Sequence, residues 1–257
     1  MKNFISILIT NYNKGKFLNK TLKSIDLQSF KNFEVIIYDD CSTDNSIEII
    51  KKFKNIKLIK NLKKNTNPCP KNQIYGTIKC FNKSRGNLIC LLDADDFFFK
   101  KKLQCIDDFF KKNEESNCLF NLPKSNRAQF NMKIKKDKGS IWPTIFPTSC
   151  ISFRRNFFIN FIRYAKVNNY QYLEIDSRIT IFSSFFYEEY NVLNRKLTIY
   201  NYDENGITAN INKLTLKWWL RRKEAYLYLK FIMRSKNKKF LPSLDYKVTR
   251  FVNAFIK

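Results

Sequence analysis

Short apolar segments that each end in polar residues, separated by segments with helical spacing, constrain the fold of this chain most strongly. Phe4–Thr10 (FISILIT), Phe33–Tyr38 (FEVIIY) and Leu88–Leu92 (LICLL) are apolar almost throughout and have the length of single strands. Between the first two, leucine and isoleucine recur at helical intervals over residues 18–25. Apolar strands that alternate with helices are typical of a parallel sheet covered on both sides, so we expect an α/β fold.

Polar clusters stand at the ends of three of these strands. Thr10–Asn13 closes the first strand, Asp39-Asp40 follows the second, and Asp93–Asp96 follows the strand at Leu88–Leu92. In open parallel sheets, ligands bind beyond the carboxyl ends of the strands, because these ends meet at one edge. The sequence therefore predicts a binding site at this edge of the sheet.

Weaker patterns predict the remaining elements. At 257 residues and 44% hydrophobic, the chain can bury one sizeable core. Strands are expected at Ile56–Ile59, Cys118–Leu122, Ser149–Phe153 and Leu197–Tyr200, helices over about residues 42–53, 71–82, 100–112, 156–165 and 175–186, and an irregular connection over 123–147.

Residue types that are absent or rare exclude several kinds of chemistry. There is no histidine, so a general base has to be Asp, Glu, Lys, Tyr or Cys. The five glycines form neither a G-x-G-x-x-G motif nor a Walker loop. Seven cysteines without a C-x-x-C pair indicate neither a disulfide framework nor a zinc site, and favour a reducing cytoplasm. No apolar stretch has the length of a membrane span, and Met1–Thr10 is too short for a signal peptide.

The formal net charge of +26 indicates anionic partners such as nucleic acid, lipid headgroups or phosphorylated substrates. A Lys- and Asn-rich composition along the whole chain explains the charge equally well. A basic nucleic-acid-binding protein is one alternative function, supported by 16% aromatic residues. No RNA-binding module is readable, however, and acids at a strand end repel phosphates unless a metal intervenes. We therefore expect no nucleic acid partner.

The run LLDADD sets three aspartates, Asp93, Asp95 and Asp96, directly after an apolar strand. A single aspartate there is readily explained as a cap for a following helix. Three within four positions favour a divalent cation that holds a diphosphate. Mg²⁺ and Mn²⁺ bind hard oxygen ligands and leave positions open for phosphate oxygens.

The chain resembles the family-two glycosyltransferases with the GT-A fold in four motifs that occur in the family's order: ISILITNYNKGKFLNKTLKSI, FEVIIYDDCSTDNS, KNQIYG and GNLICLLDADD. These motifs cover roughly residues 4–100, and further downstream the resemblance rests on TSCISFRR and YLEIDSRITIF. It implies a mostly parallel central sheet flanked by helices, with a nucleotide-binding half over about residues 1–100 and an acceptor half over about 101–212. Residues 213–257 would form a basic, aromatic-rich helical C-terminal segment.

The resemblance implies contacts to a nucleoside-diphosphate sugar, for which we favour a UDP-sugar. Thr10 and Tyr12 match positions that border the nucleotide base, and Asp40 matches an aspartate that hydrogen-bonds the base. Lys71 stands where the family usually has an arginine, so the charge is kept but the bidentate fork is lost. Asp93 would lie near the ribose. Two alternatives stay open, namely that Tyr12 is a packed turn residue and that Lys71 is one of many surface lysines.

The same resemblance implies that Asp95 of the DXD motif binds Mn²⁺ or Mg²⁺, with Asp96 assisting. The reaction would be displacement at the anomeric carbon with inversion, in which a carboxylate takes the proton of the acceptor hydroxyl. LEID at residues 173–176 opens a predicted helix, so we expect Asp176 to be the base, with Glu174 as the second candidate. An acid that only complements the helix dipole is the alternative.

The expected function is a metal-dependent, hexosyltransferase-type glycosyltransferase. It would act on a glycan or lipid-linked acceptor in surface polysaccharide or glycoconjugate synthesis. The Gln-x-x-Arg-Trp motif of processive members is absent, which favours the addition of a single sugar. Members often carry a histidine near a late glycine, but YNYDENGIT at residues 200–208 has none. A non-catalytic scaffold with the same fold is a further alternative, against which the intact DADD run argues.

The segment Lys213–Lys257 combines aromatic and basic residues at helical spacing. Tryptophans and basic residues on one helix are typical of helices that lie in the interface of an anionic membrane. Such contact would hold a cytoplasmic protein at the inner face of the cytoplasmic membrane. Packing of the same side chains onto the catalytic domain is the alternative. The residues concerned are Trp218, Trp219, Tyr226, Leu229 and Met233.

Overall fold

The computed structural model describes residues 2–63, 69–125, 142–201 and 211–255. The strands are β1 (Ile5–Asn11), β2 (Phe33–Asp39), β3 (Ile56–Lys60), β4 (Leu88–Asp93), β5 (Phe97–Phe98), β6 (Cys118–Ser125), β7 (Ile151–Arg154) and β8 (Asn191–Tyr200). The helices are α1 (Gly15–Asp26), α2 (Ser46–Lys51), α3 (Cys69–Lys83), α4 (Lys102–Lys112), α5 (Arg155–Tyr164), α6 (Ile175–Phe182), α7 (Leu216–Ser235) and α8 (Leu244–Phe255). A 3₁₀ turn, η1 (Thr148–Cys150), precedes β7, and a π-helical turn, η2 (Ser183–Tyr187), follows α6.

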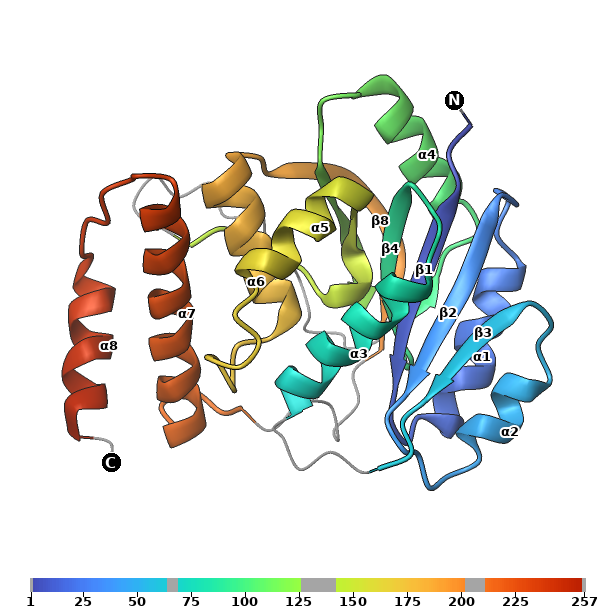
Figure 1. Ribbon diagram of the computed structural model, residues 1–257, viewed down its shortest axis with the longest axis horizontal. Coiled ribbons are helices and arrows are strands. Elements are labelled where there is room, and N and C mark those ends of the chain that lie inside the picture. Colours follow the sequence, from blue (N-terminus) through green and yellow to red (C-terminus); the bar gives the residue numbers. More distant parts are fainter. Residues whose placement is uncertain (1, 64–68, 126–141, 202–210, 256–257) are drawn as a thin grey trace.

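The eight described strands form one sheet in the order β3-β2-β1-β4-β7-β6-β8-β5 (Figure 1). The strands β3, β2, β1 and β4 are parallel to one another, as predicted from their apolar runs. β7 runs antiparallel to β4 and β6, while β6 and β8 are parallel to each other. The sheet is therefore parallel over the predicted nucleotide-binding half and mixed beyond β4.

Helices cover both faces of the sheet, because its central strands are apolar on both sides. In β1, Ile5, Ile7 and Ile9 belong to a buried cluster that includes side chains of α1, α2 and α4. Leu8 belongs to a second cluster with α3, α5, α6 and α7. Since successive side chains of a strand point to opposite faces, an apolar strand of this kind requires helices on both sides.

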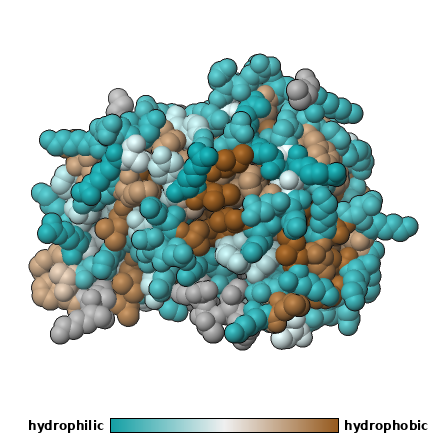
Figure 2. All heavy atoms as spheres, viewed as in Figure 1, coloured by the Kyte–Doolittle hydropathy of each residue, from teal (hydrophilic) through white to brown (hydrophobic). Residues whose placement is uncertain are grey.

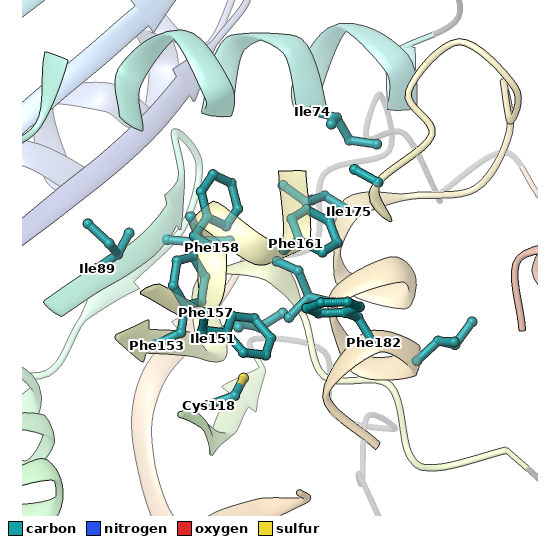
Figure 3. Packing of buried hydrophobic residues seen from close by; sticks show 14 of the residues in the cluster. Ile74, Ile89, Cys118, Ile151, Phe153, Phe157, Phe158, Phe161, Ile175 and Phe182 are labelled. Carbon is teal, nitrogen blue, oxygen red and sulfur yellow. The ribbon is translucent and has the colours of Figure 1, made fainter. Parts of the chain in front are cut away.

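Phenylalanine rings dominate the second cluster. Phe153 and Phe158 stack with ring centroids 4.9 Å apart, and Phe157 meets Phe182 edge to face at 5.4 Å. Figure 3 shows these rings converging from β7, α5 and α6, with Ile175 at the beginning of α6 beside them. The packing fixes the N-terminus of α6 relative to the sheet, which matters because the predicted base lies there.

Several boundaries differ from the sequence prediction. β6 continues through Pro123 to Ser125, because shifts in its register with β8 accommodate a residue that has no N–H group. α2 begins only at Ser46, and β8 begins as early as Asn191. The two-residue strand β5 carries no periodicity that a sequence could reveal. Residues 126–141 of the predicted connection lie outside the described ranges.

α7 packs into the same core as the strands. Tyr226, Tyr228, Leu229 and Ile232 are buried in the second cluster, so Tyr226 and Leu229 pack onto the domain and do not face a membrane. α8 lies outside α7, at the left edge of the molecule in Figure 1. In the part of the chain that the structure describes, no helix is long and apolar enough to span a membrane. The domain boundary predicted at residue 212 stays a prediction.

Candidate active site

The carboxyl ends of β1 and β4 bring the first predicted site residues together. Thr10 lies beside Asp93 in the register of these parallel strands, with Tyr38 of β2 on its other side. Tyr12 follows β1 and is 41% exposed, so its ring can lie against a ligand. Thr10, Tyr12 and Asp93 therefore share the edge at which the sequence predicts the site.

The two aspartates after β2 have different environments. Asp39 is buried and accepts hydrogen bonds from Asn11 Nδ2 at 2.7 Å, Ser42 Oγ at 2.6 Å and the Ser42 N–H at 3.0 Å. It therefore ties the loop after β2 to the end of β1. Asp40 is only half-buried, and its Oδ1 accepts from Asn61 Nδ2 at 2.8 Å. Asp40 thus remains the member of the pair that a nucleotide can reach.

The first turns of α3 approach the same edge. Lys71 is half-buried there, and Gln73 Nε2 donates to Asp93 Oδ1 at 2.8 Å. Gly76 permits this approach, because a Cβ atom at that position would lie 2.5 Å from a ring carbon of Tyr38. The glycine of KNQIYG thus brings Gln73 within reach of the acidic run.

Burial and mutual repulsion raise the pKa values of two aspartates in LLDADD. Burial, and then the charges of Asp95 and Asp176, raise the pKa of Asp93 to about 7. Asp96 is almost completely buried, and its pKa is raised well above the ordinary value by burial and by the charges of Asp93 and Asp95. Lys14, which follows β1, forms an ion pair of 2.7 Å with Asp95 and offsets part of this repulsion.

A fully buried lysine supports the end of β4 from behind. Lys102 of α4 donates to Asn121 Oδ1 at 3.0 Å, to Thr198 Oγ1 at 2.8 Å and to the backbone carbonyl of Ser149. Ser149 Oγ in turn accepts from the Asp93 N–H at 2.9 Å. Burial lowers the pKa of Lys102. The hydrogen bonds of this ammonium group link α4, β6, β8 and the strand end that carries the acids.

The acidic run fits a divalent cation that substrate phosphates complete. Within the described residues, no group of three or more acidic or cysteine side chains forms a complete metal site. Asp96 Oδ1 accepts from the Asn201 N–H at 2.8 Å, whereas Oδ2 is buried and has no hydrogen-bond partner in the described part of the chain. Mg²⁺ is usually held by one or two carboxylates together with phosphate oxygens. Asp95 and Asp96 can provide such a pair.

The two acids of LEID lie at the beginning of α6, where Arg221 of α7 meets them. Arg221 Nε pairs with Glu174 Oε2 at 2.6 Å. Burial raises the pKa of Glu174 to about 7, although Arg221 opposes the shift. Burial also raises the pKa of Asp176, and Arg221 again opposes it. Asp176 is half-buried, and its charge contributes to the raised pKa of Asp93. Ile175 packs in the same cluster as Ile74 of α3 (Figure 3), and Gln73 of α3 binds Asp93, so α3 connects LEID to LLDADD.

Two further charged residues fix the loop that leads to Glu174. Glu224 of α7 accepts hydrogen bonds of 2.7–2.9 Å from three successive backbone N–H groups of residues 171–173. Arg178 of α6 is fully buried and donates to four backbone carbonyls within residues 165–173. Because both backbone donors and acceptors of this loop are bound, Glu174 and Asp176 are held in place.

Sequence reasoning missed four residues of this site. Lys14 and Gln73 lie inside motifs that were recognised, NYNK and KNQIYG, but nothing in a single sequence sets them apart from their neighbours. Lys102 and Arg221 reach the site from helices distant in sequence, and each lies in a basic run that resembles a solvated surface. Only tertiary contacts identify them.

A sequence model of the family described as Glycosyl transferase family 2 matches residues 6–190. The chain belongs to this family. The match spans both acidic motifs and confirms the family predicted from the sequence. α7, which contributes Arg221 and Glu224, lies beyond it.

Curated relatives match part of the chain. An uncharacterized glycosyltransferase of Rickettsia conorii is 31% identical over 157 residues, which cover 58% of this chain and 24% of that protein. WfaP of Escherichia coli, a UDP-Glc:α-D-GlcNAc-diphosphoundecaprenol β-1,3-glucosyltransferase, is 35% identical over 104 residues, or 38% of each protein. The chain thus spans well under half the length of these relatives.

Solved structures confirm the GT-A fold. Staphylococcus aureus TarS 1–349 in complex with UDP-GlcNAc superposes with a TM-score of 0.66 at 15% identity, covering 88% of this chain and 66% of that one. The mannosyltransferase PcManGT of Pyrobaculum calidifontis, in complex with GDP-Man and Mn²⁺, reaches 0.58 at 12% identity and covers 100% of this chain and 82% of its own. At such identities the likeness concerns the fold alone.

Proposed function

We propose that this chain transfers a sugar from a nucleoside-diphosphate sugar to a hydroxyl group of a glycan or lipid-linked acceptor, with inversion at the anomeric carbon. One observation carries the proposal: Asp176, the acid suited to be a base, lies in the first turn of α6, which contacts α3, and Gln73 of α3 donates to Asp93 in the acidic run at the end of β4. An inverting transfer needs both a carboxylate for the hydroxyl proton and stabilisation of the leaving diphosphate. Neighbours in the fold that bind UDP-GlcNAc and GDP-Man support a nucleotide-sugar donor.

The donor would lie across the carboxyl ends of β1, β2 and β4, and we favour a UDP-sugar. The exposed ring of Tyr12 would stack on the base, with Thr10 beside it and Asp40 accepting a hydrogen bond from the base. Asp93, held by Gln73, would lie near the ribose. Lys71 would contribute its positive charge to the diphosphate.

Asp95 and Asp96 would hold Mn²⁺ or Mg²⁺. Such a cation neutralises charge that develops on the leaving diphosphate. The PcManGT complex with Mn²⁺ supports a metal of this kind. Lys14 supplies a second positive charge beside Asp95, which suits a site that receives a diphosphate.

Asp176 would take the proton of the acceptor hydroxyl as attack proceeds. Glu174 is less suited, because it is buried and paired with Arg221. Burial raises the pKa of Asp176, which makes it a stronger base than an exposed aspartate, and the charge of Arg221 opposes this rise. Glu174 would then serve to hold Arg221.

One relative supports the proposed acceptor class. WfaP acts, by its name, on a sugar linked to diphosphoundecaprenol. A comparable acceptor, a glycan or lipid-linked sugar at the inner face of the cytoplasmic membrane, would place this chain in surface polysaccharide or glycoconjugate synthesis.

Thermal shift with UDP, GDP and dTDP, each with and without Mn²⁺, tests the proposal. A ligand at 100 times its Kd stabilises by about 2.7 kcal/mol, which for a chain of this size corresponds to a shift of roughly 5 °C or more. We expect one base to give such a shift only with Mn²⁺. The Asp95→Ala variant should lose it and keep the fold, whereas Asp26→Ala, a change at an exposed acid remote from the site, should keep it. A native chain that responds to none of the nucleotides would refute the function, and an unchanged response in Asp95→Ala would refute the metal assignment.

A further inference from the structure

The outermost helix, α8, carries its apolar side chains on its exposed face. Leu244, Val248, Phe251 and Phe255 follow one another at intervals of four, three and four residues, which places them in one stripe along the helix. Their side chains are 45–77% exposed. In Figure 2, hydrophobic side chains reach the surface at the lower left, where Figure 1 shows α8.

The buried face of α8 is polar except for Tyr246, whose ring meets that of Tyr226 in α7 at 5.1 Å. Thr249 and Asn253 are its buried residues, and Asn253 Nδ2 donates to the backbone carbonyl of Trp219 in α7 at 3.2 Å. Asp245 accepts hydrogen bonds from Arg222 and Tyr226 of α7. A surface helix normally turns its apolar stripe to the core and its polar side outward. In α8 this order is reversed, so the exposed stripe is not explained by folding of the domain.

A basic groove lies directly beside the stripe. Lys247 and Arg250 are exposed and one turn apart, and they line an open groove on the side of α8. Phe251 belongs to both the groove and the stripe, and its ring meets that of Phe255 at 5.0 Å. The other groove residues are Pro242, Tyr246 and Ala254. The surface thus combines exposed aromatic side chains with two cations in a recess.

We propose that this face of α8 docks on an anionic phospholipid bilayer. Leu244, Val248, Phe251 and Phe255 would enter the boundary between headgroups and acyl chains, with the helix axis parallel to the membrane plane. Lys247 and Arg250 would meet lipid phosphates, where each basic residue near an anionic surface strengthens binding about fivefold. This assigns the membrane contact to α8 in place of α7, whose Tyr226 and Leu229 are buried in the core.

The charge of the chain favours a bilayer over a second copy of the same chain. Two copies that joined through α8 would bring Lys247 and Arg250 of each close to those of the other. A net charge of +26 on each chain would add long-range repulsion. An anionic bilayer, by contrast, attracts the same charge and covers the same apolar stripe.

Sedimentation with vesicles tests the proposal. The native chain should bind vesicles of equal parts phosphatidylglycerol and phosphatidylcholine at least about tenfold more strongly than pure phosphatidylcholine. The double variant Phe251→Ser/Phe255→Ser should lose roughly tenfold or more of this binding, because it removes the largest inserted side chains. Lys247→Glu/Arg250→Glu should lose a similar factor on the anionic vesicles alone.

Matched control variants distinguish binding through this face of α8 from non-specific hydrophobic or electrostatic binding to vesicles. Leu27→Ser removes an apolar side chain that is 65% exposed elsewhere, and Lys52→Glu/Lys54→Glu reverses two exposed charges near α2. Both should bind like the native chain. All variants should keep the native melting temperature and nucleotide response, so failure here would be distinct from failure of the proposed transfer reaction. Should the serine pair lower the melting temperature, Leu244→Ser/Val248→Ser provides a second test of the stripe.

Three results would overturn the proposal. The first is native binding by the folded serine variants, and the second is an equal loss in Lys52→Glu/Lys54→Glu, which would make the attraction non-specific. The third is a native dimer in analytical ultracentrifugation that Phe251→Ser/Phe255→Ser dissociates. In that case the stripe would be an interface between copies of this chain.

Discussion

For the proposed reaction, Arg221 makes Asp176 the better suited of the two acids at the beginning of α6 to act as the base. It holds one oxygen of Glu174 at 2.6 Å, while the other is buried and has no hydrogen-bond partner within the described residues. A hydroxyl group could approach Glu174 only if the ion pair opened. Asp176 is half-buried, and one of its oxygens accepts from the Ser177 N–H at 2.6 Å. An acceptor hydroxyl can therefore reach Asp176 more readily than Glu174.

The first prediction separates these two acids. Asp176→Asn should lower kcat by about 10²–10⁴, the usual contribution of a general base, while the Mn²⁺-dependent nucleotide shift stays native. Glu174→Gln should cost less in kcat, since its role is to hold Arg221. Both are checked by turnover with sugars of the nucleoside diphosphate that the thermal screen identifies. If Glu174→Gln lost activity while Asp176→Asn stayed active, the general base would be Glu174.

The second prediction concerns pH. Arg221 stabilises the ionised forms of Asp176 and Glu174 and so lowers both pKa values. Arg221→Met removes this cation, so the pKa of Asp176 should rise and the base should need a higher pH to ionise. The acid limb of the kcat/KM profile should therefore move to higher pH, and activity lost near neutrality should partly return on the alkaline side. Lys223→Met, at an exposed position of the same helix, should leave the profile in place. An unmoved limb in Arg221→Met would mean that the limb belongs to another group.

At the scale of elements, α7 clamps the segment that leads to Glu174 and Asp176. Arg221 and Glu224 lie one turn apart on α7, so they point to the same side of the helix. Arg221 holds the Glu174 side chain, and Glu224 holds the backbone of residues 171–173. α7 lies beyond residues 6–190, which match the family, yet it holds Glu174 and Asp176, which lie within that range.

The third prediction tests the clamp. Glu224→Ala leaves three backbone N–H groups without their acceptor, two of them in partly buried bonds. Leaving buried donors unpaired costs about 1–3 kcal/mol of the free energy of unfolding, measurable by urea denaturation. Because the loop leads directly to the two acids, kcat should fall while nucleotide binding is kept. The exposed neighbour change Lys223→Ala should alter neither. A stable Glu224→Ala variant with reduced nucleotide binding would contradict this role.

The strands β1, β2 and β4 were predictable from sequence, because continuous apolar runs such as ISILIT are read without any tertiary information. Their ends located Thr10 and the aspartates of LLDADD for the same reason. Three other features depend on tertiary neighbours that a single sequence does not reveal. They are strand β5, the continuation of β6 through Pro123, and the break between α7 and α8. Lys102 illustrates the limit for the site: in sequence it is one of three successive lysines, and only its hydrogen bonds to β6 and β8 mark it as buried.

At the scale of the whole molecule, the sheet separates two apolar clusters, and the C-terminal helices belong to them unequally. α7 contributes Tyr226, Tyr228, Leu229 and Ile232 to the cluster that also holds Ile175 at the start of α6. α8 is joined to α7 mainly by polar contacts and adds only the ring of Tyr246 to the edge of the second cluster. The chain through α7 should therefore unfold as one unit, with α8 dispensable to it.

The fourth prediction compares two truncations. Ending the chain after Asn212 removes four buried side chains of α7, each contributing about 1.5–3 kcal/mol. Their total is comparable with the 5–15 kcal/mol that stabilise a typical domain, so this fragment should show no cooperative melting. Ending the chain after Pro242 removes only α8. That fragment should melt cooperatively and keep the Mn²⁺-dependent nucleotide shift, yet lose its binding to anionic vesicles. Cooperative melting of the shorter fragment near the native temperature would show that α7 is an appendage. Vesicle binding retained by the longer fragment would place the membrane contact elsewhere on the chain.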